Sequence, residues 1–162
     1  MIPIKLFKEF INEAALETRY SAGLAIIFNG KLLVGHSTGR KKNTGYGISK
    51  GGIDEGESKL EAAIRETHEE FGIKVPRNLI QKQEYTFIVT SRKYKYNKVV
   101  YYYIVEIDKL SQIGLKSEEV PKKQLQLKEV DFARFMERNE ALTHVMQSQL
   151  PVLQTLTTLG LI

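Results

Sequence analysis

The amino-acid sequence predicts a single α/β domain that spans all 162 residues, and three observations lead to this fold class. Apolar runs of strand length occur at 20–28, 32–36, 83–90 and 98–107. Segments with helical periodicity occur at about 4–17, 58–71 and 129–158. No internal repeat, low-complexity tract or linker-like stretch interrupts these elements, and the length is that of one domain.

The first expected elements are a helix and a β-hairpin. Apolar residues at positions 7, 10, 11 and 14 lie on one side of a helix at about 4–17. The strands at 20–28 and 32–36 flank Asn29-Gly30, a dipeptide that strongly favours a two-residue hairpin turn. We therefore expect an N-terminal helix followed by two antiparallel strands.

The second half of the chain is expected to form another strand pair and then helices. The basic stretch RKYKYN joins the strands at 83–90 and 98–107. A charged loop that contains a proline follows at 114–124. Helices are expected at 129–138 and 140–157, with Pro151 kinking or dividing the second one.

The segment 51–73 contains the most informative helix. Ser58 is a suitable N-cap, and Gly72 suits the position just past a helix end. At about 100° per residue, one side of this helix is a stripe that can face a core, formed by Leu60, Ile64, Thr67 and Phe71.

Three glutamates share the neighbouring face of the same helix. Glu66, Glu69 and Glu70 are spaced i, i+3 and i+4, so their carboxylates converge on one region. Like charges at this spacing destabilise a helix, and a cation would compensate for them. Carboxylate oxygens suit Mg²⁺ or Mn²⁺, so the sequence predicts a divalent metal ion beside this face.

The whole segment 51–73 resembles the Nudix box, G-x5-E-x7-R-E-U-x-E-E-x-G-U, where U is apolar. Every fixed glycine and charged position matches, at Gly51, Glu57, Arg65, Glu66, Glu69, Glu70 and Gly72. Thr67 replaces the usual aliphatic residue, and because it lies on the core stripe this affects packing more than chemistry. The resemblance implies an α/β/α sandwich with a mixed sheet, in which the box forms a loop, a helix and a loop.

The same resemblance implies a hydrolase of nucleoside diphosphates linked to another moiety. In such a reaction water attacks a phosphorus of the pyrophosphate bridge, and positioning and electrostatics carry the rate. Glu69 and Glu70 are expected to bind the metal, and Glu66 is either a further ligand or the general base. Arg65 and Glu57 are expected to pair and so hold the helix and the loop together.

Two further contributions to the site are expected from neighbouring loops. The backbone carbonyl of Lys50 or Gly51 would complete the metal coordination, since glycine allows close backbone approach. Glu118 lies in the loop where many family members place an extra acid that binds metal or acts as a base. The same loop sequence is also that of an ordinary surface loop.

The residues just before the box bear on the substrate. The run Tyr46-Gly-Ile-Ser-Lys-Gly-Gly resembles the form found in asymmetric dinucleoside tetraphosphate hydrolases, with related forms in diphosphoinositol polyphosphate and RNA pyrophosphohydrolases. Tyr46 and Ser49 replace the usual tryptophan and proline, whereas Lys50 stays in register. We therefore expect Lys50 to contact phosphate and Tyr46 to contact the substrate.

The positive charge of the chain lies outside the acidic box. The net charge is +5, with basic clusters around Arg40, around Tyr94 and at 122–123. Such clusters can steer a polyphosphate, and Arg40 is therefore a candidate substrate contact. Tyr94 among basic residues resembles a stacking surface for a nucleobase or single-stranded RNA, although an exposed hairpin turn has the same pattern.

Composition narrows the cellular setting. The chain has no apolar run of about 18 residues and no signal-peptide pattern, so we expect a cytoplasmic protein without membrane contact. It has no cysteine, which excludes disulfides and thiolate metal sites. The sequence leaves open whether the protein is a monomer or a homodimer.

Taken with the resemblance, these features predict metal-dependent hydrolysis of a dinucleoside polyphosphate such as diadenosine tetraphosphate. The alternatives are an RNA 5′-end pyrophosphohydrolase and a hydrolase of nucleoside triphosphates or diphosphoinositol polyphosphates. A Nudix-fold nucleotide-binding regulator is the alternative without catalysis, but the box glutamates are all present.

Overall fold

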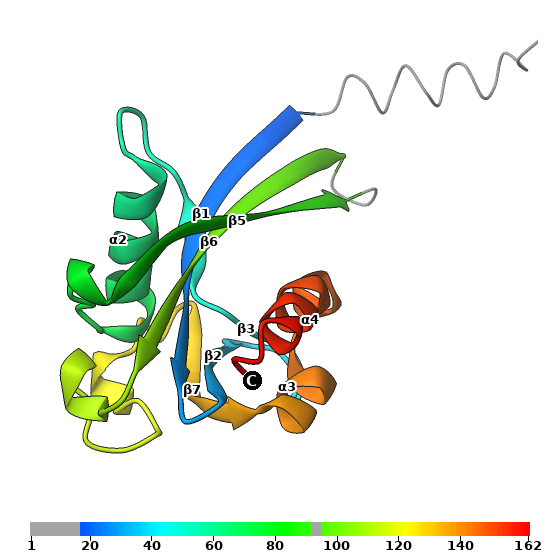
Figure 1. Cartoon of the computed structure of the whole chain (residues 1–162). Coiled ribbons are helices and arrows are strands. Elements are labelled where there is room, and N and C mark those ends of the chain that lie inside the picture. The colour runs from blue at the N-terminus through cyan, green and yellow to red at the C-terminus, as the bar shows by residue number, and fades with distance from the viewer. Residues whose placement is uncertain (1–16, 92–94) are drawn as a thin grey trace, which may run out of the picture.

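A mixed sheet lies between one helix on one face and two helices on the other, as a computed structural model shows for residues 17–91 and 95–162 (Figure 1). The helices are α2 (Lys59–Phe71), α3 (Arg138–His144) and α4 (Leu150–Thr158). The strands are β1 (Glu17–Phe28), β2 (Lys31–Ser37), β3 (Tyr46–Gly47), β4 (Lys50–Gly52), β5 (Ile80–Ser91), β6 (Tyr96–Ile107) and β7 (Val130–Glu137). The predicted α/β/α sandwich is confirmed.

Short 3₁₀ helices complete the connections, at Arg77–Leu79, Leu110–Ile113, Lys122–Gln124 and Gln147–Gln149. The helix expected at about 4–17 lies outside the described residues, except that Glu17 begins β1. None of the helices in the described part of the chain is long and apolar enough to cross a membrane.

Strand β1 organises the sheet because it pairs with three other strands. The order is β3-β2-β1-β6-β5, with β4 paired to β1 and β7 paired to β2. One edge of β1 runs parallel to β6 along its whole length. Its other edge pairs with β2 at positions 27–28 and with β4 at positions 21–23. The sheet therefore divides along this edge, and β4 lies in the fork.

The period-two pattern of β1 and β6 builds two cores. On one face, Leu24, Ile26 and Val105 pack with Phe71 of α2. On the opposite face, Ile27 and Ile104 belong to a cluster with three residues of α4, Val152, Leu153 and Leu156. Strands buried on both faces need apolar residues at nearly every position, which explains the continuous run at 21–27.

The ends of β1, β5 and β6 extend beyond α4 (Figure 1). We call this extension the sheet arm and define it as residues 17–21, 88–91 and 96–99. Tyr20, Val99 and Ile88 are cross-strand neighbours in the arm, on the face opposite Arg19 and Lys98. Arg19 and Lys98 thus share one face of the arm, where Glu17 pairs with Arg19 at 3.3 Å.

The predicted hairpin and the ends of the box helix are confirmed. Asn29 and Gly30 have φ values of 50° and 71°, which a two-residue turn of this type requires. The Ser58 side chain accepts a hydrogen bond from the Glu61 amide, and Gly72 adopts the left-handed conformation with φ 66°. Of the predicted stripe, Thr67 and Phe71 are fully buried, while the two N-terminal members are partly covered.

The helix predicted at 129–138 is wrong, because these residues form β7. Val130, Ala133, Phe135 and Met136 are buried, and the strand pairs antiparallel with β2 from position 31 to 37. Pairing with an open edge of β2 overrides a helical propensity that was weak for this aromatic-containing segment. The next helix is indeed divided: α3 ends at His144 and α4 begins at Leu150, with Pro151 in its first turn.

Candidate active site

Arg65 ties the box helix to the loop and the strand before it. Its Nε and Nη2 atoms donate hydrogen bonds of 2.8 Å and 2.9 Å to the two carboxylate oxygens of Glu57. Nη2 also donates to the carbonyl of Gly52 at 2.8 Å. The Glu57 hydrogen bond raises the pKa of Arg65 and lowers that of Glu57. The predicted Arg65–Glu57 pair is therefore confirmed.

Glu66 lies directly against the backbone of β4. A Cβ atom built on Gly51 would stand 2.0 Å from the carboxyl carbon of Glu66 and about as close to both of its oxygens. Only glycine leaves room for this carboxylate. The Glu66 side chain is 13% exposed, and burial raises its pKa even though Arg65 donates a hydrogen bond to it at 2.8 Å.

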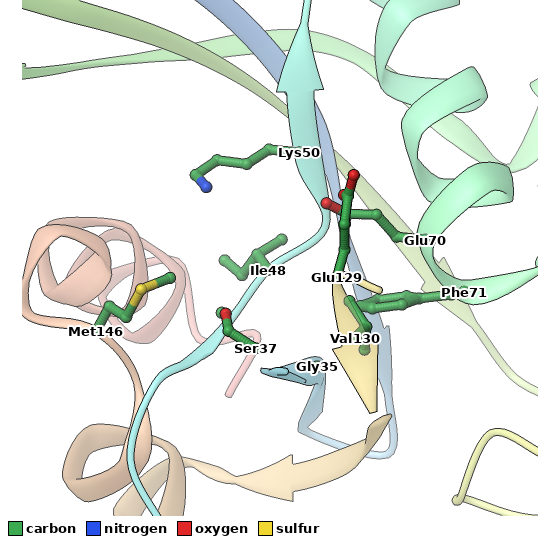
Figure 2. A pocket seen from close by; sticks show the side chains of 10 residues that line it. Gly35, Ser37, Ile48, Lys50, Glu70, Phe71, Glu129, Val130 and Met146 are labelled. Atoms are coloured by element: carbon green, nitrogen blue, oxygen red, sulfur yellow. The ribbon is translucent and has the colours of Figure 1, made fainter. Parts of the chain in front are cut away.

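Glu70 reaches from the same helix into a cavity of about 230 Å³ (Figure 2). Lys50 and Ile48 line the cavity from the segment before the box, and Glu129 lines it from the start of β7. Burial raises the pKa of Glu70 to about 7, while the Lys50 ammonium acts in the opposite direction. Figure 2 shows the carboxylates of Glu70 and Glu129 side by side.

Glu69 is the most exposed of the three glutamates, with 46% of its side chain accessible. It accepts a hydrogen bond of 3.2 Å from Nη1 of Arg65, the atom that also binds Glu66. Arg65 therefore neutralises two of the three glutamates, and Glu70 points into the cavity. Within 17–91 and 95–162, no group of three acidic, histidine or cysteine side chains is arranged to hold a metal ion.

The residues present nevertheless fit a divalent cation. Two desolvated carboxylates, Glu66 and Glu70, have raised pKa values, which is the response expected where a compensating cation belongs. The hydroxyl of Tyr102 is buried beside Glu70 and has no hydrogen-bond partner within the described residues. All of these donors are hard oxygens, which Mg²⁺ and Mn²⁺ prefer.

Two residues at this site had not been assigned to it from the sequence. Glu129 lies beside Glu70, and its negative charge contributes to the raised pKa values of both Glu66 and Glu70. Lys98 on β6 interacts electrostatically with Glu70 and Lys50, and burial lowers its pKa to about 8. Its position had a signal in the sequence, since Lys98 has the same strand parity as the buried Val100, Tyr102 and Ile104.

The other predicted contacts are not brought to the cavity. Tyr46 is only 7% exposed, and its ring packs between those of His36 and His144 at 5.0 Å and 5.9 Å. Arg40 lies in the exposed loop 38–44, where its stem covers Gly45. Tyr94 lies outside the described residues. This placement supports a structural role for Tyr46 instead of direct contact with substrate.

Glu118 is also remote from the cavity. Its carboxylate pairs with Lys31 at 2.9 Å, beside the turn between β1 and β2. Its carbonyl accepts from the amide of Phe135, near the end of β7, whereas Glu129 precedes the start of that strand. The acidic loop residue near the box is therefore Glu129, and Glu118 does not occupy that place.

The α/β/α sandwich, with an acidic helix against β4, is the frame of the site. The NUDIX domain family model matches residues 17–156, so the chain belongs to this family of enzymes that hydrolyse pyrophosphate linkages. Hydrolases of this family generally use divalent metal ions.

Solved structures show the same fold at low sequence identity. An Ap4A hydrolase binary complex from C. elegans has a TM-score of 0.63 and 18% identity, covering 88% of this chain and 97% of that one. A MutT NUDIX hydrolase from Burkholderia pseudomallei has a TM-score of 0.64 and 17% identity, covering 85% and 97%.

A bifunctional NMN adenylyltransferase/ADP ribose pyrophosphatase from Francisella tularensis, complexed with AMP and a Mn ion, also shares the fold. Its TM-score is 0.66 at 13% identity, covering 96% of this chain and 45% of that one. No curated protein matches the chain.

Proposed function

We propose that this enzyme hydrolyses a pyrophosphate linkage in a dinucleoside polyphosphate such as diadenosine tetraphosphate, with Mg²⁺ or Mn²⁺ as cofactor. The observation that carries the proposal is the cavity that Glu70, Glu129 and Lys50 line together. Such a cavity offers oxygen ligands for a metal and a cation for phosphate within one small volume. The fold similarity to an Ap4A hydrolase from C. elegans supports the choice of substrate.

The site residues divide into those that hold the cofactor and those that hold the helix. Glu69, Glu70 and Glu66, with a backbone carbonyl of Lys50 or Gly51, would bind the metal. When bound, the metal ion neutralises phosphate charge and makes a water more acidic. Arg65 and Glu57 keep the helix against β4 through the hydrogen bonds described above.

Proton transfer from the attacking water requires a carboxylate at the cavity. Glu66 is one candidate, as either a ligand or the base. Glu129 is the second, because its side chain lies in the cavity beside Glu70 and is otherwise exposed. A general base must lie within reach of the water it activates, and both carboxylates lie near the proposed metal ligand Glu70.

An RNA 5′ end is the second candidate substrate. The face of the sheet arm that carries Arg19 and Lys98 supports it, because Lys98 lies near Lys50 and Glu70 of the cavity and Arg19 lies opposite Lys98. Both candidate substrates, the dinucleoside polyphosphate and the RNA 5′ end, carry a short chain of phosphates. We expect the enzyme to act in the cytoplasm.

A substrate panel tests the proposal. The protein is incubated with Mg²⁺ or Mn²⁺ and with diadenosine tetraphosphate, ADP-ribose, a nucleoside triphosphate, a diphosphoinositol polyphosphate or 5′-triphosphorylated RNA. The products are separated and identified by chromatography. We expect diadenosine tetraphosphate to be turned over fastest, and we expect EDTA to abolish turnover. Faster turnover of the RNA would replace the first candidate with the second, and no turnover of any compound would refute the proposal.

A further inference from the structure

We propose that Gln149 is a positioning residue for the metal site, because its side chain fixes the backbone that crosses from β3 to β4. This crossing segment contributes to the site in two ways. The side chains of Ile48 and Lys50 line the cavity (Figure 2), and the carbonyl of Lys50 or Gly51 is a proposed metal ligand. The inference rests on the metal ligands of the proposed function but not on its choice of substrate.

The crossing segment changes its neighbours at Ile48 and Ser49. Before this point β3 pairs with β2, and after it β4 pairs with β1. Ile48 and Ser49 belong to neither strand, and both residues are buried. A buried backbone N–H group without an acceptor is costly, so the amide of Ile48 needs a partner from outside the sheet.

Gln149 supplies this partner. Its Oε1 atom accepts a hydrogen bond of 2.6 Å from the Ile48 amide. The residue is 2% exposed, and its Nε2 atom has no hydrogen-bond partner within the described residues. What the side chain contributes is therefore an acceptor, which lies 101 residues along the chain from the amide that it binds.

The connection between α3 and α4 runs alongside the same segment. Val145 forms an isolated parallel bridge with Tyr46, and the Met146 amide donates a hydrogen bond of 2.8 Å to the carbonyl of Tyr46. The Gln149 amide in turn donates to the Met146 carbonyl at 2.8 Å. These contacts bring the Gln149 side chain to Ile48, and they explain why Tyr46 is enclosed instead of facing the cavity.

Two glycines let the crossing segment fit closely between Gln149 and β1. A Cβ atom built on Gly47 would stand 3.0 Å from Nε2 of Gln149. A Cβ atom built on Gly23 would stand 2.1 Å from the carbonyl oxygen of Ser49. Since neither position has room for a methyl group, the segment is packed on both sides. A shift of Ile48 would therefore move the residues that follow it, up to the start of β4.

Binding of Mn²⁺ to the full-length protein tests the inference without any substrate. Affinity is measured by calorimetry for the wild type, Gln149→Met, Gln149→Glu and Gln154→Met, at a temperature where circular dichroism shows each protein to be folded. Methionine keeps the length of the side chain and removes the acceptor, whereas glutamate keeps an acceptor. Gln154 is exposed on α4 and receives the same change to methionine as a matched control.

We expect Gln149→Met to weaken Mn²⁺ binding about tenfold or more, because residues that orient metal ligands typically contribute that much. Gln149→Glu and Gln154→Met should stay close to wild type. Wild-type affinity in Gln149→Met would overturn the inference. An equal loss in Gln149→Glu or in Gln154→Met would also overturn it, since the acceptor at position 149 would then not be the cause.

Hydrogen exchange tests the same coupling in the wild type and needs no variant to fold. If breaking the Gln149–Ile48 hydrogen bond weakens Mn²⁺ binding, bound Mn²⁺ must hinder that break by the same factor. We expect the Ile48 amide to exchange about tenfold more slowly with saturating Mn²⁺, relative to the Gly114 amide in a remote turn. Equal slowing of both amides, or no slowing of either, would overturn the inference.

The substrate panel separates this inference from the proposed function. If Mn²⁺ affinity depends on Gln149 but no compound is turned over, the proposed function fails and the positioning role stands. If a dinucleoside polyphosphate is turned over while Mn²⁺ affinity and exchange of the Ile48 amide are independent of one another, the positioning role fails and the proposed function stands.

Discussion

The carboxyl group of Glu66 fills the space that a side chain at position 51 would occupy. The absence of a side chain at Gly51 therefore positions a functional group that lies fifteen residues further along the chain. Arg65 secures the same contact from the other side through the carbonyl of Gly52. The first glycine of the box thus acts through Glu66 as well as through its own backbone.

Replacing Gly51 with alanine should displace the Glu66 carboxylate. Because a misplacement of about 1 Å can cost about a hundredfold in rate, we expect kcat to fall by about that factor. The fold should persist, as judged by circular dichroism, since the contact is with a partly exposed side chain. Gly52→Ala is the control, because a Cβ atom there would meet nothing within 4 Å. Equal losses in the two variants would show that Glu66 is not the group affected.

Glu70→Gln should make the metal-free protein more stable at high pH. The folded-state pKa of Glu70 is about 7, above its ordinary value of 4.5. Between these values the folded protein binds more protons than the unfolded chain, so stability falls as pH rises and stays lower above pH 7. Glutamine removes this penalty, and we expect a gain of about 1–3 kcal/mol at pH 8 and none near pH 4.

Urea unfolding in EDTA at both pH values measures this effect. The same variant should lose activity on the order of a hundredfold with Mg²⁺, because it lacks a ligand charge. Glu69→Gln should lose activity with little change in stability, since Glu69 is largely exposed. Full activity in either variant would contradict the assignment of the metal ligands.

Glu129→Gln should reduce activity, whereas Glu118→Gln should not. Glu129 lies in the cavity beside Glu70, and we expect a loss of about 10–100-fold in kcat. Glu118 is paired with Lys31 at the opposite end of β7, so its loss should cost only about 1 kcal/mol of stability. Steady-state kinetics of both variants provide the comparison. If Glu118→Gln lost activity and Glu129→Gln did not, Glu118 would be the functional acid as the sequence predicted.

Glu57→Gln should weaken the connection between the box loop and helix α2 in a pH-dependent way. The Arg65 hydrogen bond lowers the folded-state pKa of Glu57 below its ordinary value of 4.5. Its stabilisation is therefore present above pH 4.5 and disappears as pH falls through the lowered pKa. We expect the variant to lose about 1–3 kcal/mol at pH 7 and to approach wild type in acid. Thermal melts of the variant and the wild type at several pH values measure this effect. If the stability difference did not depend on pH, it would come from packing and not from the charge of Glu57.

The fold and the box were largely predictable because their signals are local. Asn29-Gly30 specifies its own turn, and Ser58 and Gly72 cap their own helix. By contrast, β7 is a strand because β2 offers it an edge, and no local pattern in 130–137 encodes that partner. Tertiary pairing decided this segment, as it does wherever intrinsic propensity is weak.

In the candidate site, too, local contacts were predictable from the sequence and contacts made by tertiary structure were not. The Arg65–Glu57 pair was predictable from the box, since both residues lie within one short segment. Glu129 and Lys98 reach the cavity from β7 and β6, and only the sheet topology brings them there. The aromatic character of Tyr46 suggested a substrate contact, but its neighbours His36 and His144 enclose the ring.

The fork in the sheet at β1 has a consequence for how such an enzyme can change. Strand β4, whose Gly51 lies against Glu66, pairs with one edge of β1, whereas β6 pairs with the other edge. Exposed residues of the sheet arm, such as Tyr20 and Ile88, can therefore be exchanged without disturbing Glu66, Glu69 or Glu70. New specificities can arise by mutation on one side of this strand while the chemistry on the other side is inherited unchanged.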